Sequence, residues 1–360
     1  MQLGTSVAIS VQDNSDVGEA RRAAAVFSRT LALDPTVAGK LAIVVTEAAT
    51  NLVKHGRGGS ILLSRRQDEG VSAVEMLAID KGPGMDNVSR FMVDGYSTAD
   101  SPGNGLGAIA RLSTFHEVYS SPGLGTVVLA QLRSPVSGPR QPPRPPPGFE
   151  IGAVGVPIGG ETVCGDAWIA HPSDHGIRVL LADGLGHGDG AAEAANRALE
   201  IAHNHVPDSP LELLERIHAG LRFTRGAAVS VAEIDLDQGI VQYAGLGNVA
   251  GVLVVAGEHR RHMISYNGTA GHEARKITSF SYPWTADSIL VLHSDGLIAQ
   301  WSVDRYPGLY RCHPSIVAAV LFRDFQHRSD DATVVVVRQA ARQAARQAVR
   351  QASRTLESSS

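Results

Sequence analysis

The stretch "LADGLGHGDG", Leu181 to Gly190, decides the fold of the second half of the chain. The apolar run "IRVLLAD" (Ile177 to Asp183) ends there in an aspartate, and glycine then recurs at every second position. The run predicts a buried strand, and a helix is expected from about Gly190 to His205. An aspartate that ends a strand beside glycine suits a metal, which can take a carboxylate from one residue and a bare carbonyl from the next.

Further strands are predicted on both sides of this stretch. The segments are "AAVSVAEID", "GIVQYAGLG", "AGVLVVAG", "SILVLHSD" and "ATVVVVR". Helices are expected at about Pro210 to Phe223 and Pro314 to Phe325. Many strands with a few long helices favour a β-sandwich flanked by helices over residues 149–338.

The aspartates of this half lie mostly where strands begin or end: Asp166, Asp183, Asp295, Asp330 and Asp331. In a sandwich, such ends can converge on one rim. Two carboxylates about 4 Å apart repel by roughly 4 kcal/mol at an effective dielectric near 20, so a cluster needs protons or cations. A pair of divalent metals can neutralise the charge and activate water for attack on phosphorus. For any single Asp-Gly pair, a plain turn is the simpler interpretation.

The first half predicts a separate α/β (α+β) domain over residues 1–133. A strand in "TSVAISV" is followed by helices at about Ser15 to Leu31 and from Pro35, capped by Asp34, to just before Gly56. Two strands, a helix after "GNGLG" and the hairpin "HEVYSSPGLGTVVLAQL" complete it. This order favours helices packed on one face of a mixed sheet.

Three stretches of the first half carry groups that suit a nucleotide and its metal. Glu47 and Asn51 leave the same face of one helix, where a carboxylate can accept a proton and an amide oxygen can bind Mg²⁺. In "DKGPGMD" (Asp80 to Asp86), an aspartate ends a strand and glycines allow a ligand to approach the backbone. The glycines of "GNGLG" precede a helix whose first amides can hold phosphates.

The order and spacing of these stretches resemble the GHKL (Bergerat) ATP-binding fold, most closely the small serine kinases of the RsbT/RsbW type. The resemblance implies that Asn51 binds Mg²⁺, that Asp80 accepts a hydrogen bond from adenine, and that Glu47 is the base for a substrate hydroxyl. It also implies a lid over residues 95–103. It assigns Gly82, Gly84, Gly105 and Gly107 to the pocket and the phosphate loop. The other predicted ATP-binding residues are Lys54, one turn after Asn51, where a cation could meet phosphate, and Gly103 and Leu106 of "GNGLG".

Two further interpretations of the first domain stay open. Besides the kinase, which the presence of Glu47 favours, the domain could be a non-catalytic nucleotide sensor or an anti-sigma-like module that sequesters a partner. A P-loop is excluded because the chain has no GxxxxGK motif.

In the second half, the set GD…ADGxGHG…SDG…DDAT resembles the metal-dependent (PPM, type 2C) serine/threonine protein phosphatases of the SpoIIE/RsbX branch. The resemblance implies that Asp183 bridges two Mn²⁺ or Mg²⁺ ions, with the Gly184 carbonyl on one of them. Asp295 and Asp330 would hold the other ion, and Asp166 would bind directly or through water. Metal-activated water would attack the phosphoserine or phosphothreonine without a covalent enzyme intermediate.

The chain departs from the eukaryotic type 2C pattern at two points. Leu185 stands where that pattern has histidine, and His187 follows two residues later, either to protonate the leaving oxygen or only to orient water. No arginine before Asp166 matches the one that clamps substrate phosphate in the eukaryotic relatives, so the phosphate-binding group stays open. Whether Asp330 or Asp331 is the metal ligand also stays open.

Composition limits the partners and the location. The 360 residues are 43% hydrophobic with a net charge of −4, which gives no reason to expect nucleic acid as the main partner. The first residues lack a signal peptide, and no apolar run approaches the roughly 18 residues of a membrane span, so we expect a cytoplasmic protein. A proline-rich linker is predicted at 134–148, and an exposed low-complexity tail at 339–360.

The two resemblances together imply one partner for both domains. They suggest a STAS-domain anti-anti-sigma or RsbS/RsbR-like protein that one domain phosphorylates and the other dephosphorylates. The sequence leaves open whether the chain forms a homodimer.

Overall fold

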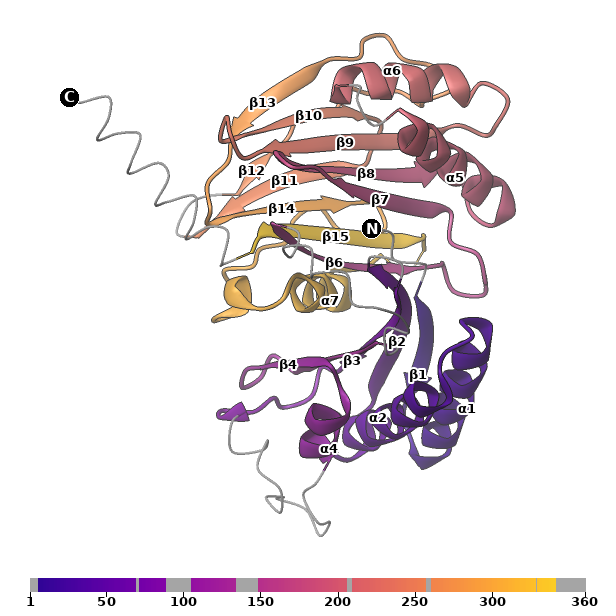
Figure 1. Cartoon of the computed structure of the whole chain (residues 1–360), viewed down its shortest axis with the longest axis vertical. Helices are drawn as coiled ribbons and strands as arrows, with labels where there is room; N and C mark the ends of the chain where they lie inside the picture. Colours follow the sequence, from indigo (N-terminus) through magenta and orange to yellow (C-terminus); the bar gives the residue numbers. More distant parts are fainter. Residues whose placement is uncertain are drawn as a thin grey trace, which may run out of the picture. The chain divides into compact units, whose positions relative to one another are not determined.

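The computed structural model describes residues 6–68, 71–88, 105–133, 148–205, 209–256, 260–327 and 329–340 (Figure 1). The chain divides into two compact units. The first comprises Met1–Gly138, Ala153–Cys164 and Gly296–Thr333, and the second Pro139–Gly152, Gly165–Asp295 and Val334–Ser360. Of the predicted features, the lid at 95–103, nearly all of the linker and nearly all of the tail lie outside the described residues. The domain bounds drawn from the sequence stay a prediction.

A five-stranded sheet in the order β1-β2-β3-β5-β4 forms the centre of the first unit. Its strands are β1 (Val7–Val11), β2 (Gly59–Asp68), β3 (Val71–Ile79), β4 (Phe115–Ser120) and β5 (Thr126–Arg133). Every neighbouring pair is antiparallel, so the expectation of a mixed sheet was wrong. For two of the pairs, β2–β3 and β4–β5, the physical reason is that they are hairpins, whose short connections permit only antiparallel pairing.

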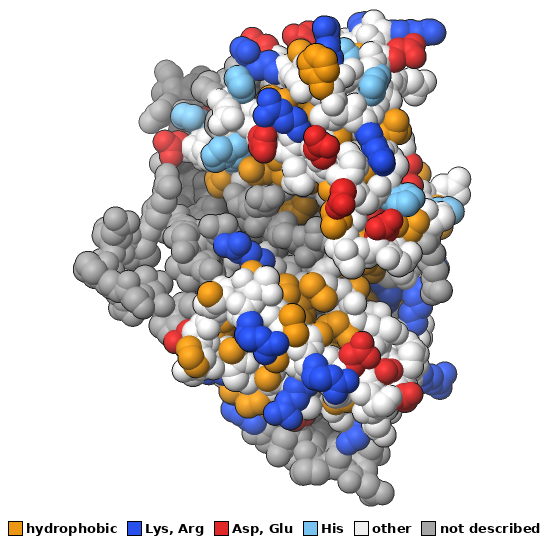
Figure 2. Space-filling view, turned by 90° about the vertical axis from the view of Figure 1, so that its right-hand side faces the viewer, with side chains coloured by type: hydrophobic (Ala, Val, Ile, Leu, Met, Phe, Trp, Pro, Cys, Tyr) orange, Lys and Arg blue, Asp and Glu red, His pale blue; other side chains and the backbone are white. Residues whose placement is uncertain are grey.

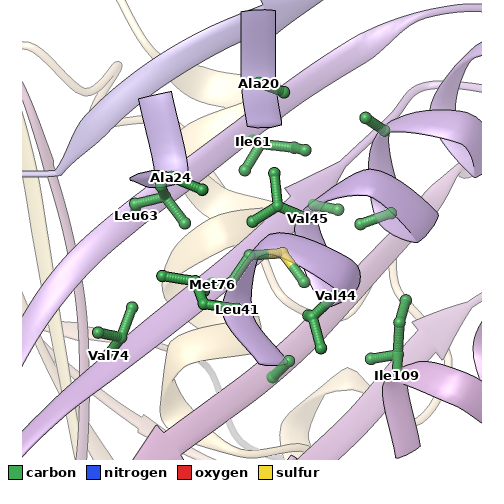
Figure 3. Close-up of a cluster of buried hydrophobic side chains, with 14 of the residues drawn as sticks. Ala20, Ala24, Leu41, Val44, Val45, Ile61, Leu63, Val74, Met76 and Ile109 are labelled. Atoms are coloured by element: carbon green, nitrogen blue, oxygen red, sulfur yellow. The ribbon is translucent and has the colours of Figure 1, made fainter. Parts of the chain in front are cut away.

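Three helices, α1 (Asn14–Thr30), α2 (Pro35–Lys54) and α4 (Gly105–Leu112), cover one face of this sheet. Figure 3 shows Leu41, Val44 and Val45 of α2 packed against side chains of the strands, among them Ile61 and Met76. The helix begins as predicted, because the Asp34 carboxylate accepts hydrogen bonds from the amides of residues 36 and 37. Among the described helices, α2 is long and apolar enough to cross a membrane, but its apolar side forms this core.

The other face of the sheet is covered by α7 (Pro314–Phe325), which comes from the second half of the sequence. Side chains alternate along a strand, so Val74 and Met76 face the helical core while Glu75 faces the opposite way. Glu75 is completely buried, and Arg66 and Gln131 both donate hydrogen bonds to its Oε2. The helices of residues 1–133 therefore pack on one face of the sheet, as expected, and α7 covers the other face, which the sequence did not predict.

The second unit contains two facing sheets. One has the order β13-β10-β9-β8-β7 and the other β12-β11-β14-β15-β6. The first comprises β7 (Asp166–Pro172), β8 (Gly176–Gly184), β9 (Ala227–Asp235), β10 (Ile240–Leu246) and β13 (Ser279–Pro283). The second comprises β11 (Ala250–Val255), β12 (Arg261–His262) and β14 (Ser288–His293), with the parts of β6 (Phe149–Val156) and β15 (Ala332–Gln339) that belong to this unit.

Helices α5 (Asp189–Asn204) and α6 (Pro210–Gly220) cover the outer face of the first of these sheets. Between the sheets, the fully buried ring of Tyr243 lies so close to Gly251 of β11 that a Cβ there would be 2.6 Å from it. The predicted β-sandwich flanked by helices is confirmed. Helix α6 ends at Gly220, before the predicted Phe223, and the residues that follow form a turn.

Charged groups of both signs reach the surface. Figure 2 shows one face of the molecule, on which acidic, basic and histidine side chains are interspersed. Exposed large hydrophobic side chains include Phe223 (101% exposed) and Leu185 (57% exposed). Single exposed apolar residues are ordinary, so these two matter only through what lies next to them.

Candidate functional site

The predicted catalytic and metal-binding groups of the first unit come together where α4 begins. A Cβ built on Gly105 would lie 3.1 Å from Asn51 Oδ1 and 3.2 Å from Glu47 Oε2. Both of these α2 side chains are half-buried and point at the first turn of α4. The structure therefore places a carboxylate, an amide oxygen and a helix N-terminus side by side.

Asp80 forms the second part of this site, just after β3. It is buried, and its Oδ1 accepts hydrogen bonds from the amides of Gly82 (2.8 Å) and Thr126 (3.1 Å). Burial raises the pKa of the Asp80 carboxyl, while these two bonds and the charge of Arg323 act in the opposite direction. The two amides hold one carboxylate oxygen in place, as a hydrogen-bond acceptor for a ligand requires.

The end of α2 connects the two parts. The carbonyl of Asn51 accepts hydrogen bonds from the amides of His55 and Gly56, and Gly56 lies against Gly82 and the Asp80 side chain. The other predicted ATP-binding residues differ in their surroundings. Lys54 is exposed, whereas Leu106 packs on the core and Gly107 is buried. Gly84 has a φ of +70°, and Gly103 lies outside the described residues. The described donors and glycines fit a nucleotide.

A contact that the sequence did not predict joins Asp80 to α7. The buried Arg323 donates a hydrogen bond from Nη1 to the Asp80 carbonyl (2.9 Å). Its Nη2 and Nε contact the two carboxylate oxygens of Asp324 at 2.6 and 3.1 Å. Asp324 also contacts Lys81, the residue after Asp80, at 3.4 Å. A helix from the second half of the sequence is thus bonded to the predicted adenine site.

In the second unit, Asp166 and Asp183 face each other at the ends of β7 and β8. They are register partners in an antiparallel pair, so both side chains lie on the same face with Cβ atoms about 5 Å apart. Gly184 follows directly, and a Cβ there would overlap the Ala191 carbonyl of α5. Two carboxylates at this spacing are the oxygen donors that Mg²⁺ and Mn²⁺ prefer.

Asp295 joins this pair through the other sheet. Ser294, which precedes it and follows β14, donates a hydrogen bond from Oγ to Asp166 Oδ2 at 2.7 Å. The amide of Asn248 donates to Asp295 Oδ2 at 2.5 Å. Asn248 was not among the residues predicted to bind a metal, and it contacts one that was. The strand ends of both sheets thus meet at one rim, as the fold pattern indicated.

The remaining predicted ligand, Asp330, belongs to the first unit. Its Oδ1 accepts a hydrogen bond from the Asp331 amide, and the buried Asp331 accepts one from the amide of Ile158 at 2.7 Å. The more exposed carboxylate is that of Asp330. Within the described ranges, no group of three or more His, Cys, Asp or Glu side chains is close enough to hold a metal ion. Within the second unit, Asp166, Asp183 and Asp295 thus lie at neighbouring strand ends without forming such a group.

His187, the predicted acid, is exposed in the loop between β8 and α5. Its carbonyl accepts a hydrogen bond from Arg225 Nη1 at 3.4 Å. No motif in the sequence pointed to Arg225, because its position depends on the pairing of β8 with β9.

Comparisons with known proteins agree with both halves of this picture. Residues 173–340 match the family described as Stage II sporulation protein E (SpoIIE), and residues 11–132 match the histidine kinase-like ATPase domain. The phosphoserine phosphatase RsbX of Bacillus subtilis (strain 168) is 25% identical over 138 residues, which are 38% of this chain and 69% of RsbX. The serine/threonine-protein kinase RsbT of the same strain is 27% identical over 115 residues, which are 32% of this chain and 86% of RsbT.

Among solved structures, a chain from a study of the bacterial stressosome, a modular system adapted to control secondary messenger signalling, is similar with a TM-score of 0.50 and 25% identity. The match covers 53% of this chain and 99% of that one. The chain is therefore similar to the SpoIIE family over residues 173–340 and to the histidine kinase-like ATPase domain over residues 11–132, ahead of that region.

Proposed function

We propose that this chain is a cytoplasmic signalling protein whose SpoIIE-type domain removes phosphate from phosphoserine or phosphothreonine of a protein partner. The observation that carries the proposal is the register pairing of Asp166 with Asp183, tied through Ser294 to the strand end that bears Asp295. The similarity to the phosphoserine phosphatase RsbX supports the choice of substrate class.

The groups that would hold two Mg²⁺ or Mn²⁺ ions are the carboxylates of Asp166, Asp183, Asp295 and Asp330 and the carbonyl of Gly184. When bound, these ions would supply an activated water and neutralise the charge of the phosphoryl group. The chain's own residues prepare the site: Ser294 fixes the orientation of Asp166, and Asn248 fixes that of Asp295. His187, exposed on the neighbouring loop, can protonate the leaving oxygen or orient water.

For the first domain, we propose ATP binding with phosphate transfer to the same partner. Asp80 would accept a hydrogen bond from adenine, Asn51 would bind Mg²⁺, and Glu47 would take the proton of the substrate hydroxyl. The similarity to the kinase RsbT supports this role. RsbX, RsbT and the stressosome structure point to a STAS-domain protein as the shared partner.

The test incubates the full chain with Mn²⁺ and a phosphorylated STAS protein encoded by a neighbouring gene, and follows phosphate release. Asp183→Asn should abolish release, because it removes a carboxylate that would hold the metal ions. Glu47→Ala is the matched control, since it alters the other domain and should leave release intact. If Asp183→Asn still releases phosphate at the wild-type rate, the metal assignment fails.

A specific contact favours a second function for the first domain, that of a non-catalytic regulator. The hydrogen bond from Arg323 to the Asp80 carbonyl attaches the predicted adenine site to the segment that leads to Asp330. The two functions differ in labelled-phosphate transfer from ATP, which a kinase performs and Glu47→Ala abolishes. A regulator shows no transfer, and its phosphatase rate instead depends on ATP.

A further inference from the structure

The loop between α6 and β9, Leu221 to Gly226, lies directly beside the loop that follows Asp183. The β8–β9 register pairs Asp183 with Ala228 and Gly184 with Ala227. On the next rung, the Leu185 amide donates a hydrogen bond to the Gly226 carbonyl at 2.9 Å. Continuing this register brings Arg225 opposite Gly186.

The guanidinium of Arg225 lies across the glycines of the Asp183 loop. A Cβ built on Gly186 would be 3.4 Å from Arg225 Nη1, and one on Gly190 would be 2.6 Å from its Nε. Nη1 also donates to the His187 carbonyl at 3.4 Å. Glycine at these positions leaves room for the planar group, which any side chain at Gly190 would displace.

Arg225 is exposed, and within the described part of the chain no carboxylate forms an ion pair with it. The first turn of α5, which contains Gly190, carries partial positive charge, so the helix does not stabilise a cation there. An anionic ligand bound beside this guanidinium would therefore gain charge-assisted hydrogen bonds that the protein itself does not provide.

The loop is held in shape before any ligand arrives. Leu221 is buried, the Thr224 hydroxyl donates to its carbonyl at 2.8 Å, and the Gly226 amide donates to that hydroxyl at 3.1 Å. This fixed turn presents the fully exposed ring of Phe223 between two arginines, and the exposed Leu185 lies on the paired loop. A preformed loop loses little entropy when it binds.

We propose that Arg225 binds the phosphoryl group of the protein substrate, and that Phe223 contacts the polypeptide next to the phosphorylated residue. This inference rests on the proposed phosphatase function and supplies the phosphate-binding group that the sequence left open. The planar fork of arginine matches two phosphoryl oxygens, whereas lysine offers only a point charge. The apolar ring beside the Arg225 guanidinium favours a folded or extended protein segment over a free phosphate ester.

The test measures kcat and KM of the full chain with Mn²⁺ on p-nitrophenyl phosphate and on a phosphoserine peptide. Arg225→Ala should lower kcat/KM on both substrates about 10- to 100-fold and raise the inhibition constant of inorganic phosphate, with Arg225→Lys between it and the wild type. Arg222→Ala, an exposed neighbour on the same turn, is the matched control and should behave as the wild type. Phe223→Ala should lower kcat/KM more for the peptide than for p-nitrophenyl phosphate.

A binding measurement separates this inference from the proposed function. Calorimetric titration of Asp183→Asn with the phosphoserine peptide should show a dissociation constant that rises at least about tenfold when Arg225→Ala is added. If the wild type releases phosphate and Arg225→Ala matches it in kcat/KM, phosphate inhibition and peptide affinity, the role of Arg225 is refuted while the phosphatase stands. If the wild type acts on neither substrate, the proposed function itself fails.

Discussion

Removing the Arg323 guanidinium should loosen α7 from the sheet of the ATPase unit. In Arg323→Ala, the Asp80 carbonyl loses its donor and Asp324 loses the two contacts at 2.6 and 3.1 Å. Tyr306 and Lys81 remain to hold Asp324, with the Tyr306 hydroxyl donating at 2.8 Å. The Asp324 carboxylate therefore keeps part of its stabilisation, whereas the Asp80 carbonyl keeps none from this helix.

The cost of the substitution follows from these contacts. A buried acceptor left without its charged donor costs about 1–3 kcal/mol. Breaking a fully buried ion pair costs about 3–5 kcal/mol, but the Asp324 side chain is 20% exposed and keeps two partners, so only a fraction applies. We expect a loss of about 2–3 kcal/mol in the free energy of unfolding of the first unit.

Trp301 offers a local probe, because it is buried and belongs to the same unit as α7. Urea unfolding is followed by its fluorescence in a background with Trp168→Phe and Trp284→Phe. Arg197→Ala is the control, since its exposed pair with Glu200 should contribute less than about 0.5 kcal/mol. An Arg323→Ala transition within 0.5 kcal/mol of the parent would refute the contact with Asp80.

Three other outcomes can be measured on single variants. Gly105→Ala should weaken ATP binding about tenfold or more in a fluorescent-nucleotide titration, because its Cβ would lie 3.1 Å from Asn51 Oδ1. Gly39→Ala, in the same helix as Asn51, is the control: its Cβ meets nothing within 4 Å, so it should raise the stability measured by thermal unfolding by about 0.5–1 kcal/mol. Gly184→Ala should destabilise by about 2 kcal/mol or more in urea unfolding, because its Cβ overlaps a carbonyl of α5. Burial lowers the pKa of His171 from 6.5 to about 4. The unfolded chain therefore binds a proton at this residue before the folded protein does, and the folded protein should lose stability as the pH falls from 6.5 to 4. His171→Phe should flatten that part of the pH–stability curve.

Local sequence patterns were sufficient for most helices and strands. The Asp34 cap with Pro35 placed the start of α2, and hydrophobic runs placed β8, β14 and β15. Strands β6 and β7 were not predicted, because "FEIGAVGV" and "DAWIAHP" contain glycine, proline and charge that weaken the pattern. The burial of α7 could have been predicted from "PSIVAAVLFRDF", because its apolar residues are not confined to one side of the helix, and such a helix packs against the protein on more than one side.

The contacts of the site depended on information that local patterns do not hold. Motif order indicated that Asp166 and Asp183 belong to one site, but only the β7–β8 register makes them direct partners. Arg225, just before β9, and Asn248, just after β10, are positioned by where these strands pair with their neighbours, and a shift of the register by one residue would move both. Pairing between distant strands is set by the packing of the whole unit.

The contact between Arg323 and Asp80 also decides what kind of regulation is physically available. If ATP at Asp80 favours one arrangement of α7, and that arrangement changes the position of Asp330, then ATP changes metal affinity by some factor. Linkage requires that the metal change ATP affinity by the same factor. Because ATP itself binds divalent ions, both titrations are made in excess Mg²⁺. Mn²⁺ titration with and without ATP, and ATP titration with and without Mn²⁺, must then agree, and Arg323→Ala must reduce both effects together. If α7 only stabilises the sheet, ATP does not change Mn²⁺ affinity and Mn²⁺ does not change ATP affinity, whatever the stability of the chain.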